Sequence, residues 1–414
     1  MFNLCFAGFF NKIIVRRYGF MEYEQGKILL SNAVKGFHGR FKKLYGQMAL
    51  RLDEETCIVT SANMQLSAIT EEHFMLCDIN NGDLGEIFRR CPGVNAIIFG
   101  CSADAVAVSE RSEPLTSALE DLAQLTGSSL RIINDLKPES VAGAFRQSGV
   151  ALVRGMGIIC GASNMKKAVA GIQIAEKACE AEIHGELLGG TVPLDPALSE
   201  RLMRSFRQDY VNRNQEPHVQ FVGFDEAEFA LRSALIEYGK EMVRRDLSYG
   251  SWGNLSVRLN DHEMLITPSS MDYFEIRPED IVRLDLQDLD YGEQRIPSSA
   301  CGLHAELYQR FPDCGAIIQS TSNGMSVFAA CEAGFGLGPE MQQLIGDVLV
   351  TEYAYPGTPE LAAAAAETLA STHACVIPHH GAVFTGPSLE VVFMIAEAVE
   401  QRARSLLGFD STPE

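Results

Sequence analysis

The sequence predicts an α/β protein made of two tandem domains of the same kind, each with a mostly antiparallel central sheet flanked by helices. Three observations support this prediction: the length of the chain, an internal repeat, and the alternation of helical and strand-like periodicity. The chain has 414 residues, of which 46% are hydrophobic. Because single hydrophobic cores stop growing at about 250 to 300 residues, two domains are the expected arrangement.

The internal repeat consists of three pairs of similar segments that keep their order along the chain, which chance similarity seldom does. In one pair a helix end runs into a buried strand, and in another two strands joined by a tight turn lead into a long closing helix. The paired segments are residues 90–98 and 310–318, residues 149–161 and 374–386, and residues 46–51 with 60–61 and 253–258 with 267–270.

The second copy shows clear strand and helix patterns. Apolar residues at helical spacing predict a helix over residues 225–246, which the glycines around Gly250 and Gly253 would end. Short apolar runs bounded by turn residues predict strands. These strands are expected at residues 255–259, 264–267 and 281–286.

Three further helices follow from start signals in the second copy. Ser298 or Ser299 is the expected N-cap of a helix that runs to about Arg310. Thr358-Pro359-Glu360 is a strong helix start for residues 359–371, and the last helix is expected over residues 388–406.

The domain boundaries follow from the ends of the two copies. Residues 2–10 are apolar, but the basic residues follow this run, which does not fit a signal peptide. Met21 is an alternative start of translation, because the domain pattern begins after it. Glycines and polar residues between the copies suit a linker that contains a short amphipathic helix. We therefore predict an N-terminal extension at 1–21, a first domain at 22–186, a linker at 187–217 and a second domain at 218–414.

Charge and cysteine content restrict the expected partners and compartment. The chain has 54 acidic and 34 basic residues and a net charge of -20, which disfavours nucleic acid and anionic membrane surfaces as partners. The 11 cysteines are scattered singly, so they indicate neither a disulfide framework nor a thiolate zinc site. No stretch approaches the roughly 20 apolar residues of a membrane span. We expect a cytoplasmic protein.

Several short motifs of the second copy occur in one fixed order. They are Gly253-Asn254-x-Ser256-x-Arg258, Leu265-Ile266-Thr267-Pro268-Ser269, Pro297-Ser298-Ser299, Arg310-Phe311-Pro312-Asp313, Gly357-Thr358-x-Glu360-Leu361 and His379-His380-Gly381. With them, the second copy resembles the class II aldolase/adducin family, typified by L-fuculose-phosphate aldolase and ribulose-phosphate 4-epimerase. The resemblance spans nearly all of residues 222–408. It is looser over residues 24–185, where it rests mainly on the internal repeat.

The resemblance implies which residues would bind zinc and move a proton. Family members hold zinc with a His-x-His pair and a later His-Gly histidine, and a glutamate after Pro-Ser-Ser serves as acid and base. Here the His-x-His positions are Gln319 and Thr321, and the glutamate position is Ala300. Only His380 remains of this set. The expectation is therefore no metal and no cofactor, with a weak zinc site as the alternative.

In the first copy the same resemblance leaves no metal ligands. The three ligand positions are Phe99, Cys101 and Met156, and the Pro-Ser-Ser segment is missing around Asn80 and Asn81. We expect this copy to bind no metal.

The phosphate-recognition part of the family pattern is better preserved. By resemblance, Asn254, Ser269, Ser298 and Ser299 would donate hydrogen bonds to a phosphate or carboxylate, with Ser299 near a helix N-terminus. Ser270 replaces the usual glycine of that loop. The alternative is that these residues only cap turns and helix starts.

The remaining candidates have structural alternatives. His380 could be a relic ligand or general base, but a turn histidine bonded to backbone is the favoured interpretation. Glu340 could replace the missing catalytic carboxylate, but an acid also suits the helix N-terminus where it lies. His304 follows Ser299 by about one turn, and a structural role is favoured there too. His379 is expected to be exposed.

The leading hypothesis is a pseudoenzyme that binds a sugar phosphate or another small anion, or acts through assembly as the adducin branch does. The alternative is an active aldehyde-lyase or epimerase on a phosphorylated sugar, with a site rebuilt from His380, His304, Gln319 or acids donated by the neighbouring domain. Family members commonly form fourfold rings with sites between subunits. A homodimer of this chain could therefore form a pseudo-fourfold ring in which the first copy supplies one wall of a cleft.

Overall fold

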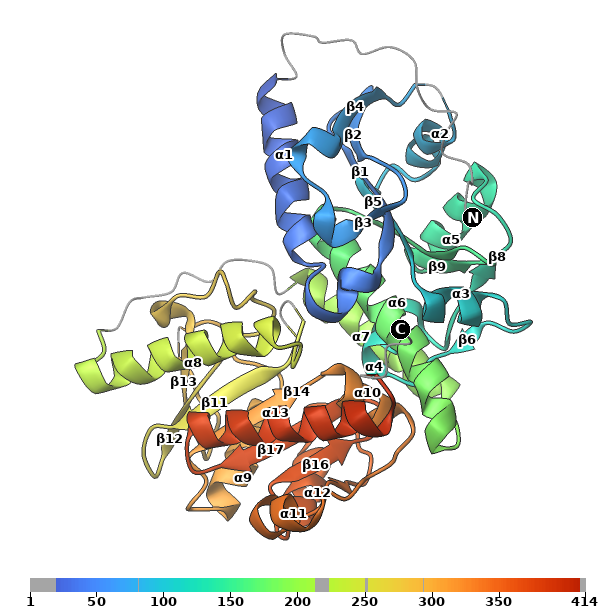
Figure 1. The fold of residues 1–414 in the computed structure, drawn as a ribbon. Helices are drawn as coiled ribbons and strands as arrows, with labels where there is room; N and C mark the ends of the chain where they lie inside the picture. Colours follow the sequence, from blue (N-terminus) through green and yellow to red (C-terminus); the bar gives the residue numbers. More distant parts are fainter. Residues whose placement is uncertain (1–19, 81, 213–222, 250–251, 293, 410–414) are drawn as a thin grey trace. The chain divides into compact units, whose positions relative to one another are not determined.

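The computed structural model describes residues 20–80, 82–212, 223–249, 252–292 and 294–409 (Figure 1). It divides into two compact units. The first unit is Met1–Ile183 with Leu194–Arg207, and the second unit is His184–Pro193 with Gln208–Glu414. Most of the predicted N-terminal extension and residues 213–217 of the predicted linker lie outside the described residues. The boundaries drawn from the sequence stay a prediction, because the two units interleave around residues 184–207.

The first unit contains a large sheet with strand order β4-β2-β1-β5-β10-β9-β8, with β3 paired to β1. Its pairs are antiparallel except for β8 with β9. The strands are β1 (Tyr45–Arg51), β2 (Thr56–Thr60), β3 (Met64–Gln65), β4 (Phe74–Asp78), β5 (Ala96–Cys101), β8 (Ile132–Ile133), β9 (Val150–Val153) and β10 (Gly157–Ala162), and a separate ladder pairs β6 (Leu115–Thr116) with β7 (Ser129–Leu130). The helices are α1 (Phe20–Lys35), α2 (Asp83–Arg90), α3 (Ala103–Ser109), α4 (Glu120–Thr126), α5 (Pro138–Gln147), α6 (Met165–Gly185) and α7 (Pro196–Asn212).

The second unit contains a sheet with strand order β13-β12-β11-β14-β17-β16-β15. Its pairs are antiparallel except for β15 with β16, which confirms the predicted α/β class with a mostly antiparallel sheet. The strands are β11 (Asn254–Arg258), β12 (Glu263–Ile266), β13 (Val282–Asp285), β14 (Ala316–Ser320), β15 (Leu349–Val350), β16 (Ala374–Ile377) and β17 (Gly381–Gly386).

Helices cover both faces of the sheet in the second unit (Figure 1). Helices α8, α10 and α13 contact the strands from one side, whereas α9 and α12 pack together with a core cluster on the other side. Their bounds are α8 (Glu226–Arg244), α9 (Cys301–Arg310), α10 (Asn323–Ala330), α11 (Pro339–Ile345), α12 (Pro359–Leu369) and α13 (Leu389–Leu406).

Two predicted helix signals in the second unit are wrong. Helix α8 ends at Arg244, within two residues of the predicted end at 246, but Gly253 does not end it: Asp246 takes a left-handed conformation with φ 58° and Leu247 N donates to Met242 O at 2.8 Å. This backbone hydrogen bond from Leu247 to Met242 ends the helix without a glycine. Gly250 lies outside the described residues.

The second wrong end is the start of α9. Its N-cap is Ala300, not Ser298 or Ser299. Ser298 lies two residues before this N-cap, where its carbonyl oxygen accepts from Cys301 N at 3.0 Å and its hydroxyl accepts from Ala300 N at 3.3 Å. A tight turn at Ser298 therefore precedes the helix and supplies the capping acceptors.

The two units share the same strand register. Gln47 of β1 lies opposite Phe99 of β5, and Asn254 of β11 lies opposite Gln319 of β14. A threonine at the end of the next strand binds the first strand in both units. Thr60 Oγ1 accepts from Met48 N at 2.9 Å, and Thr267 Oγ1 accepts from Leu255 N at 3.2 Å.

The backbone of the two units also takes the same unusual conformations. In the turn between the last two strands, Gly155 has φ 65° and His379 has φ 63°. After β2 and β12, Asn63 has φ 56° and Ser270 has φ 62°. Left-handed residues at equivalent places show that the repeat seen in the sequence is a repeat of the fold.

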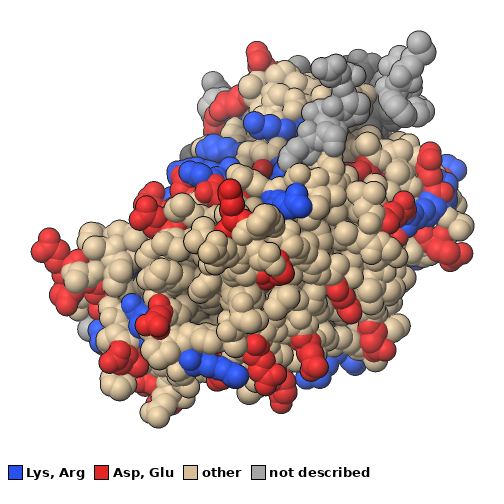
Figure 2. Space-filling model, turned by 60° about the horizontal axis from the view of Figure 1, so that its bottom comes forward, with Lys and Arg blue, Asp and Glu red and all other residues tan. Residues whose placement is uncertain are grey.

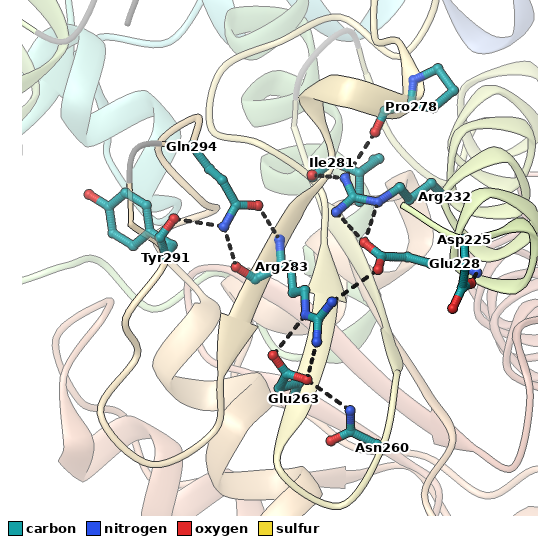
Figure 3. Close-up of polar contacts among 10 residues, drawn as sticks. All are labelled: Asp225, Glu228, Arg232, Asn260, Glu263, Pro278, Ile281, Arg283, Tyr291 and Gln294. Carbon is teal, nitrogen blue, oxygen red and sulfur yellow. Dashed lines mark hydrogen bonds and ion pairs between the residues drawn. The ribbon is translucent and has the colours of Figure 1, made fainter. Parts of the chain in front are cut away.

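A buried charge network joins α8 to the strands β12 and β13 (Figure 3). The Arg232 guanidinium donates to Glu228 Oε1 through Nε at 2.8 Å and through Nη2 at 2.5 Å. It also donates to the carbonyl oxygens of Pro278, at 3.0 Å, and Ile281. Glu228 Oε2 in turn accepts from Arg283 Nη1 at 3.1 Å. The carboxylate of Glu228 therefore pairs with two arginines, Arg232 through Oε1 and Arg283 through Oε2.

Charged side chains are scattered over the molecular surface. On the face drawn in Figure 2, lysine and arginine side chains lie among more numerous acidic ones and form no broad basic area on the described residues. This distribution agrees with the net charge of -20. In the part of the chain that the structure describes, no helix has both the length and the apolar composition needed to cross a membrane.

Candidate functional site

Three buried polar residues lie at the ends of β11 and β14 in the second unit. Asn254 begins β11 and Gln319 lies opposite it in β14, and Asn254 Nδ2 donates to Gln319 Oε1 at 2.8 Å. Thr321 follows Gln319 by two residues, directly after Ser320 ends β14. The exposed fractions of the three are 7%, 3% and 4%. We call Asn254, Gln319 and Thr321 the polar cluster.

The polar cluster contains atoms with unused hydrogen-bonding capacity. Among the described residues, Asn254 Oδ1 and Thr321 Oγ1 are buried without a hydrogen-bond partner. Most buried polar groups in native proteins have a partner, and each exception calls for an explanation. A bound ligand would supply the missing partners.

His304 lies behind the polar cluster on α9. Its Nδ1 is 2.7 Å from Ser256 Oγ, which is also 2.8 Å from Tyr308 OH, and its Nε2 has no partner among the described residues. Burial lowers the pKa of His304 to about 3, so the imidazole is neutral at neutral pH. The structural role favoured for this residue agrees with its place in the core.

The turn that carries His380 lies against the end of β14. A Cβ atom at Gly381 would come within 2.2 Å of Ser320 O and 3.3 Å of Thr321 Cα, which only glycine avoids. His380 N donates to Ile377 O at 3.1 Å within the turn. The backbone of Gly381, the residue after His380, therefore lies beside the backbone of Thr321.

His379 is buried, so the expectation that it is exposed is wrong. Its exposed fraction is 5%, its Nε2 lies 3.2 Å from Glu332 Oε1, and its ring meets Tyr353 edge-on at 5.1 Å. The left-handed backbone at this residue, with φ 63°, turns the side chain into the protein. His379 N donates to Ala329 O at 2.9 Å, which ties the turn to α10.

The serines of the two predicted anion-binding loops lie side by side. Ser298 N donates to Thr267 O at 3.1 Å, and Ser269 N donates to Ile296 O at 2.9 Å. Thr267 is bonded to Leu255, the residue after Asn254. Ser298 is buried, whereas Ser299 is exposed just before α9. The structure therefore places these loops next to the polar cluster.

Ser270 has a strained backbone, with φ 62°, and its Oγ lies 3.1 Å from Ser269 Oγ. A left-handed conformation costs an L-residue about 1 kcal/mol, and glycine avoids this cost. We expect Ser270→Gly to keep or raise the free energy of unfolding, by up to about 1 kcal/mol, and Ser270→Val to lower it by about 1 to 2 kcal/mol. Urea unfolding of the two variants tests this, and a destabilised Ser270→Gly protein would contradict it.

Glu340 is not a member of the polar cluster. It is exposed in the first turn of α11, after the N-cap Gly338. An acid at this place interacts favourably with the helix dipole, which explains Glu340 without a catalytic role.

The first unit differs at every corresponding position. Phe99, Cys101 and Met156 are each partly buried, and they offer no imidazole or carboxylate. The chain passes from β4, which ends at Asp78, into α2 at Asp83, whereas β13 and α9 in the second unit are separated by residues 286–300. The shorter connection agrees with the missing Pro-Ser-Ser segment. Asn81 lies outside the described residues.

The donors around His380 do not fit zinc well. Zinc in proteins is held by cysteine, histidine and carboxylate ligands, whereas the polar cluster offers two amides and a hydroxyl. Among the described residues, three converging acidic side chains occur instead in the first unit, at Asp104, Glu176 and Glu180.

That acidic group already contains a cation. Lys43 Nζ lies 2.7 Å from Asp104 Oδ2 and 3.4 Å from Glu176 Oε1, and it also contacts Glu180. Arg40 Nη1 lies 3.1 Å from Glu180 Oε2. The sequence analysis missed this group, because its members are far apart in the chain and follow no motif.

Glu176 gives the first unit a pH-dependent stability. Burial raises the pKa of its carboxyl from 4.5 to about 7, Lys43 opposes the rise and Glu180 adds to it. Because the folded pKa exceeds the unfolded one, the stabilising contribution is complete below pH 4.5 and is lost as the pH rises through 7. We expect the free energy of unfolding to fall by on the order of 1 to 3 kcal/mol across this range, and by less in Glu176→Gln.

The measurement is urea unfolding at several pH values. The control is Glu139→Gln, which removes an exposed carboxyl that pairs with Arg90. A Glu176→Gln protein with the same pH dependence as the unmodified protein would contradict the assignment.

Comparison with known proteins gives the family. The class II aldolase and adducin N-terminal domain matches residues 35–183 and 233–407. A 5-methylthioribulose-1-phosphate/5-deoxyribulose-1-phosphate aldolase of Rhodospirillum rubrum is 33% identical over 176 residues, which are 42% of this chain and 79% of that protein. An L-fuculose phosphate aldolase of Haemophilus influenzae is 29% identical over 184 residues, which are 44% of this chain and 84% of that protein.

A solved structure of an L-fuculose 1-phosphate aldolase is 35% identical and covers 45% of this chain and 89% of its own, with a TM-score of 0.41. The two regions that match the family domain together make up more than half of the 414 residues. They fall one in each half of the chain, as the internal repeat predicts. The chain therefore belongs to the class II aldolase and adducin family and carries the family domain twice.

Proposed function

We propose that the second unit binds a small phosphorylated sugar, or an organic anion of similar size, and does so without zinc. The observation that carries the proposal is the polar cluster, in which Asn254 Oδ1 and Thr321 Oγ1 are buried without partners among the described residues. An unsatisfied buried polar group costs about 1 to 3 kcal/mol. A ligand that supplied partners to these two atoms would remove this cost, which supports a binding site at this end of the sheet.

The phosphate end of the ligand would lie at the start of α9. Ser298 and Ser299 directly precede this helix of 10 residues, whose N-terminal amides and dipole favour an anion. Ser269 lies next to them through the bond from its amide to Ile296 O. The printed names of the relatives from Rhodospirillum rubrum and Haemophilus influenzae both specify a sugar phosphate, which supports the same class of ligand.

The groups that a zinc aldolase or epimerase needs are poorly represented. Ala300 stands where the resemblance implies the acid and base glutamate, and His380 is the histidine left at the ligand positions. A rebuilt site would need another proton acceptor beside the substrate. His304 is fully buried and its pKa is lowered to about 3, so it is a poor acceptor at neutral pH. These features support binding or assembly rather than catalysis.

The experiment is calorimetric titration of the chelator-treated protein with a ketose 1-phosphate. We expect saturable binding that is insensitive to EDTA. Ser299→Ala should weaken it by about fivefold, the effect of a hydrogen bond of about 1 kcal/mol. The matched control is Ser388→Ala, which removes the N-cap serine of α13. Absence of binding, or binding that EDTA abolishes, would overturn the proposal.

A further inference from the structure

We propose that Cys57 and Cys77 of the first unit form a reversible disulfide bond that fastens the edge strand β4 to β2. The two cysteines lie directly opposite each other in these antiparallel strands, and both are free thiols in the structure. Side chains of directly opposite residues lie on the same face of a sheet and are close neighbours. This modification site lies in the first unit, so it is independent of ligand binding by the second unit.

The two thiols pack against the same core cluster of the first unit. Cys57 is fully buried within this cluster, whereas Cys77 is partly exposed. Burial raises the pKa of Cys57, the neighbouring Cys77 adds to the rise, and the Arg51 guanidinium opposes it. Arg51 lies opposite Cys57 on β1, so Cys57 has an arginine in one neighbouring strand and a cysteine in the other. A reagent from solvent can therefore reach Cys77, and Cys57 is placed to react with Cys77.

The backbone geometry allows a disulfide between these strands but strains it. Ile79 N donates to Glu55 O at 2.8 Å, and hydrogen-bonded pairs alternate along antiparallel strands, so Cys57 and Cys77 also form a hydrogen-bonded pair. The Cα atoms of such a pair are about 5.5 Å apart, within the range of roughly 4.4 to 6.8 Å for disulfides. Opposite Cβ atoms are about 4.5 to 5.5 Å apart, whereas most disulfides need roughly 3.5 to 4.5 Å. The strands must therefore move together, and the resulting strain makes the bond easier to reduce.

The second unit fastens its corresponding edge strand, β13, without cysteines. Arg283 N donates to Gln294 Oε1 and Gln294 Nε2 donates to Arg283 O, both at 2.8 Å (Figure 3). Gln294 belongs to the connection between β13 and α9, which is the connection that is shorter in the first unit. Among the described residues of the first unit, no side chain bonds to the backbone of β4 in this way. A disulfide would supply the attachment that β4 lacks.

The cysteine pair is specific to the first unit. Thr60 and Thr267 hold equivalent places in the two sheets, and Met264 precedes Thr267 by three residues, as Cys57 precedes Thr60. Met264 lies opposite Leu284, and both are buried. An apolar pair fills this place in the second unit, so the shared fold does not require two thiols there.

The oxidant is a low-molecular-weight disulfide, such as oxidised glutathione. The Cys77 thiolate attacks one of its sulfur atoms, which forms a mixed disulfide on Cys77 and releases one molecule of reduced glutathione. The Cys57 thiolate then attacks Cys77 Sγ, which forms the protein disulfide and releases the second molecule. The two cysteines together lose two electrons and two protons, and the oxidant gains them. In a reducing compartment such a bond is transient, which suits a redox sensor rather than a permanent crosslink.

The experiment is incubation of the folded protein with oxidised glutathione, followed by alkylation with N-ethylmaleimide in urea, trypsin digestion and mass spectrometry. A mildly alkaline pH is used because burial raises the pKa of the Cys77 thiol. Trypsin cuts after Arg51 and Arg89 but not between them, so both cysteines are released in one peptide, residues 52–89. We expect this peptide to have lost two hydrogens and to carry no alkyl group. Excess reduced glutathione should restore both thiols while the protein stays folded.

Two variants and one natural cysteine are the controls. Cys57→Ala should leave Cys77 as a stable mixed disulfide with glutathione. Cys77→Ala should leave Cys57 reduced, and it keeps the test open if Cys57→Ala does not fold. Cys101 is also partly exposed but lies opposite Tyr45, so it should form no bond within the protein.

Two results would overturn the proposal. The first is a peptide 52–89 from the unmodified protein that stays reduced or ends as a mixed disulfide on Cys77. The second is an internal disulfide that excess reduced glutathione leaves intact in the folded protein, because the bond would then be permanent rather than reversible.

Discussion

The variant Ala300→Glu, Gln319→His, Thr321→His is expected to bind close to about one zinc ion per chain, and the unmodified protein less than about a tenth of an ion. Residue 319 lies near the end of β14 and residue 321 directly follows this strand, and the turn of His380 lies against Thr321 Cα through Gly381. Three imidazoles would then converge, which is the ligand number of a catalytic zinc site. Inductively coupled plasma mass spectrometry of protein purified without a histidine tag measures the metal.

The control for this prediction adds His380→Ala to the three substitutions. We expect the fourth change to remove most of the gained zinc, because two histidines hold the ion far less well than three. The zinc content of the unmodified protein could contradict the zinc-free proposal. Near-stoichiometric zinc that His380→Ala removes would refute the zinc-free proposal and restore a metal-dependent lyase as the best interpretation.

The sequence predicted the fold well because its main signals are local and occur twice. The N-cap Thr358 accepts from Leu361 N at 3.4 Å and starts α12 at Pro359, where the Thr-Pro-Glu pattern places it. Ser388 caps α13 in the same way. Capping needs only neighbouring residues, so it can be read without the tertiary structure. The repeat then extends the prediction to the less regular first unit.

The candidate site was predictable only in its position. The resemblance assigned Gln319 and Thr321 to ligand positions and Asn254 to the anion-binding set, but it gave no sign that the Asn254 amide bonds to Gln319 and leaves Oδ1 without a partner among the described residues. The pairing of side chains depends on rotamers and on neighbours from other strands, which a linear pattern does not contain. The buried His379 is a similar case, because its left-handed backbone decides its direction.

The buried charged residues of the first unit were even harder to predict from the sequence than the candidate site. Lys43 reaches Asp104 and Glu176, which are far away in the sequence. Lysine and glutamate usually indicate solvent-exposed positions, so neither composition nor periodicity predicts that they are buried together. Only the fold brings their helices into contact.

Replacement of Arg232 by alanine is expected to lower the free energy of unfolding by about 3 to 5 kcal/mol. Arg232 is buried and donates both to Glu228 and to the carbonyl oxygens of Pro278 and Ile281 (Figure 3). Its removal takes this donor from the carbonyl oxygens of Pro278 and Ile281 and leaves the largely buried Glu228 with Arg283 as its charged partner. Arg283 cannot replace it, because its guanidinium is already divided between Glu228 and Glu263, with Nη2 at 2.6 Å from Glu263 Oε2.

The matched control is Arg245→Ala, since Arg245 also pairs with two glutamates but its side chain is 51% exposed. Solvent screens such pairs, so its loss should cost about 1 kcal/mol or less. Urea unfolding of both variants gives the comparison, and equal losses would contradict a special role for Arg232.

Replacing Glu228 and Arg232 together by methionine should recover part of the stability lost in Arg232→Ala, because no buried charge is then left unpaired. Recovery in the double variant would show that the cost comes from the loss of Arg232 as a charged partner of Glu228, and no recovery would assign it to the lost bonds to Pro278 and Ile281.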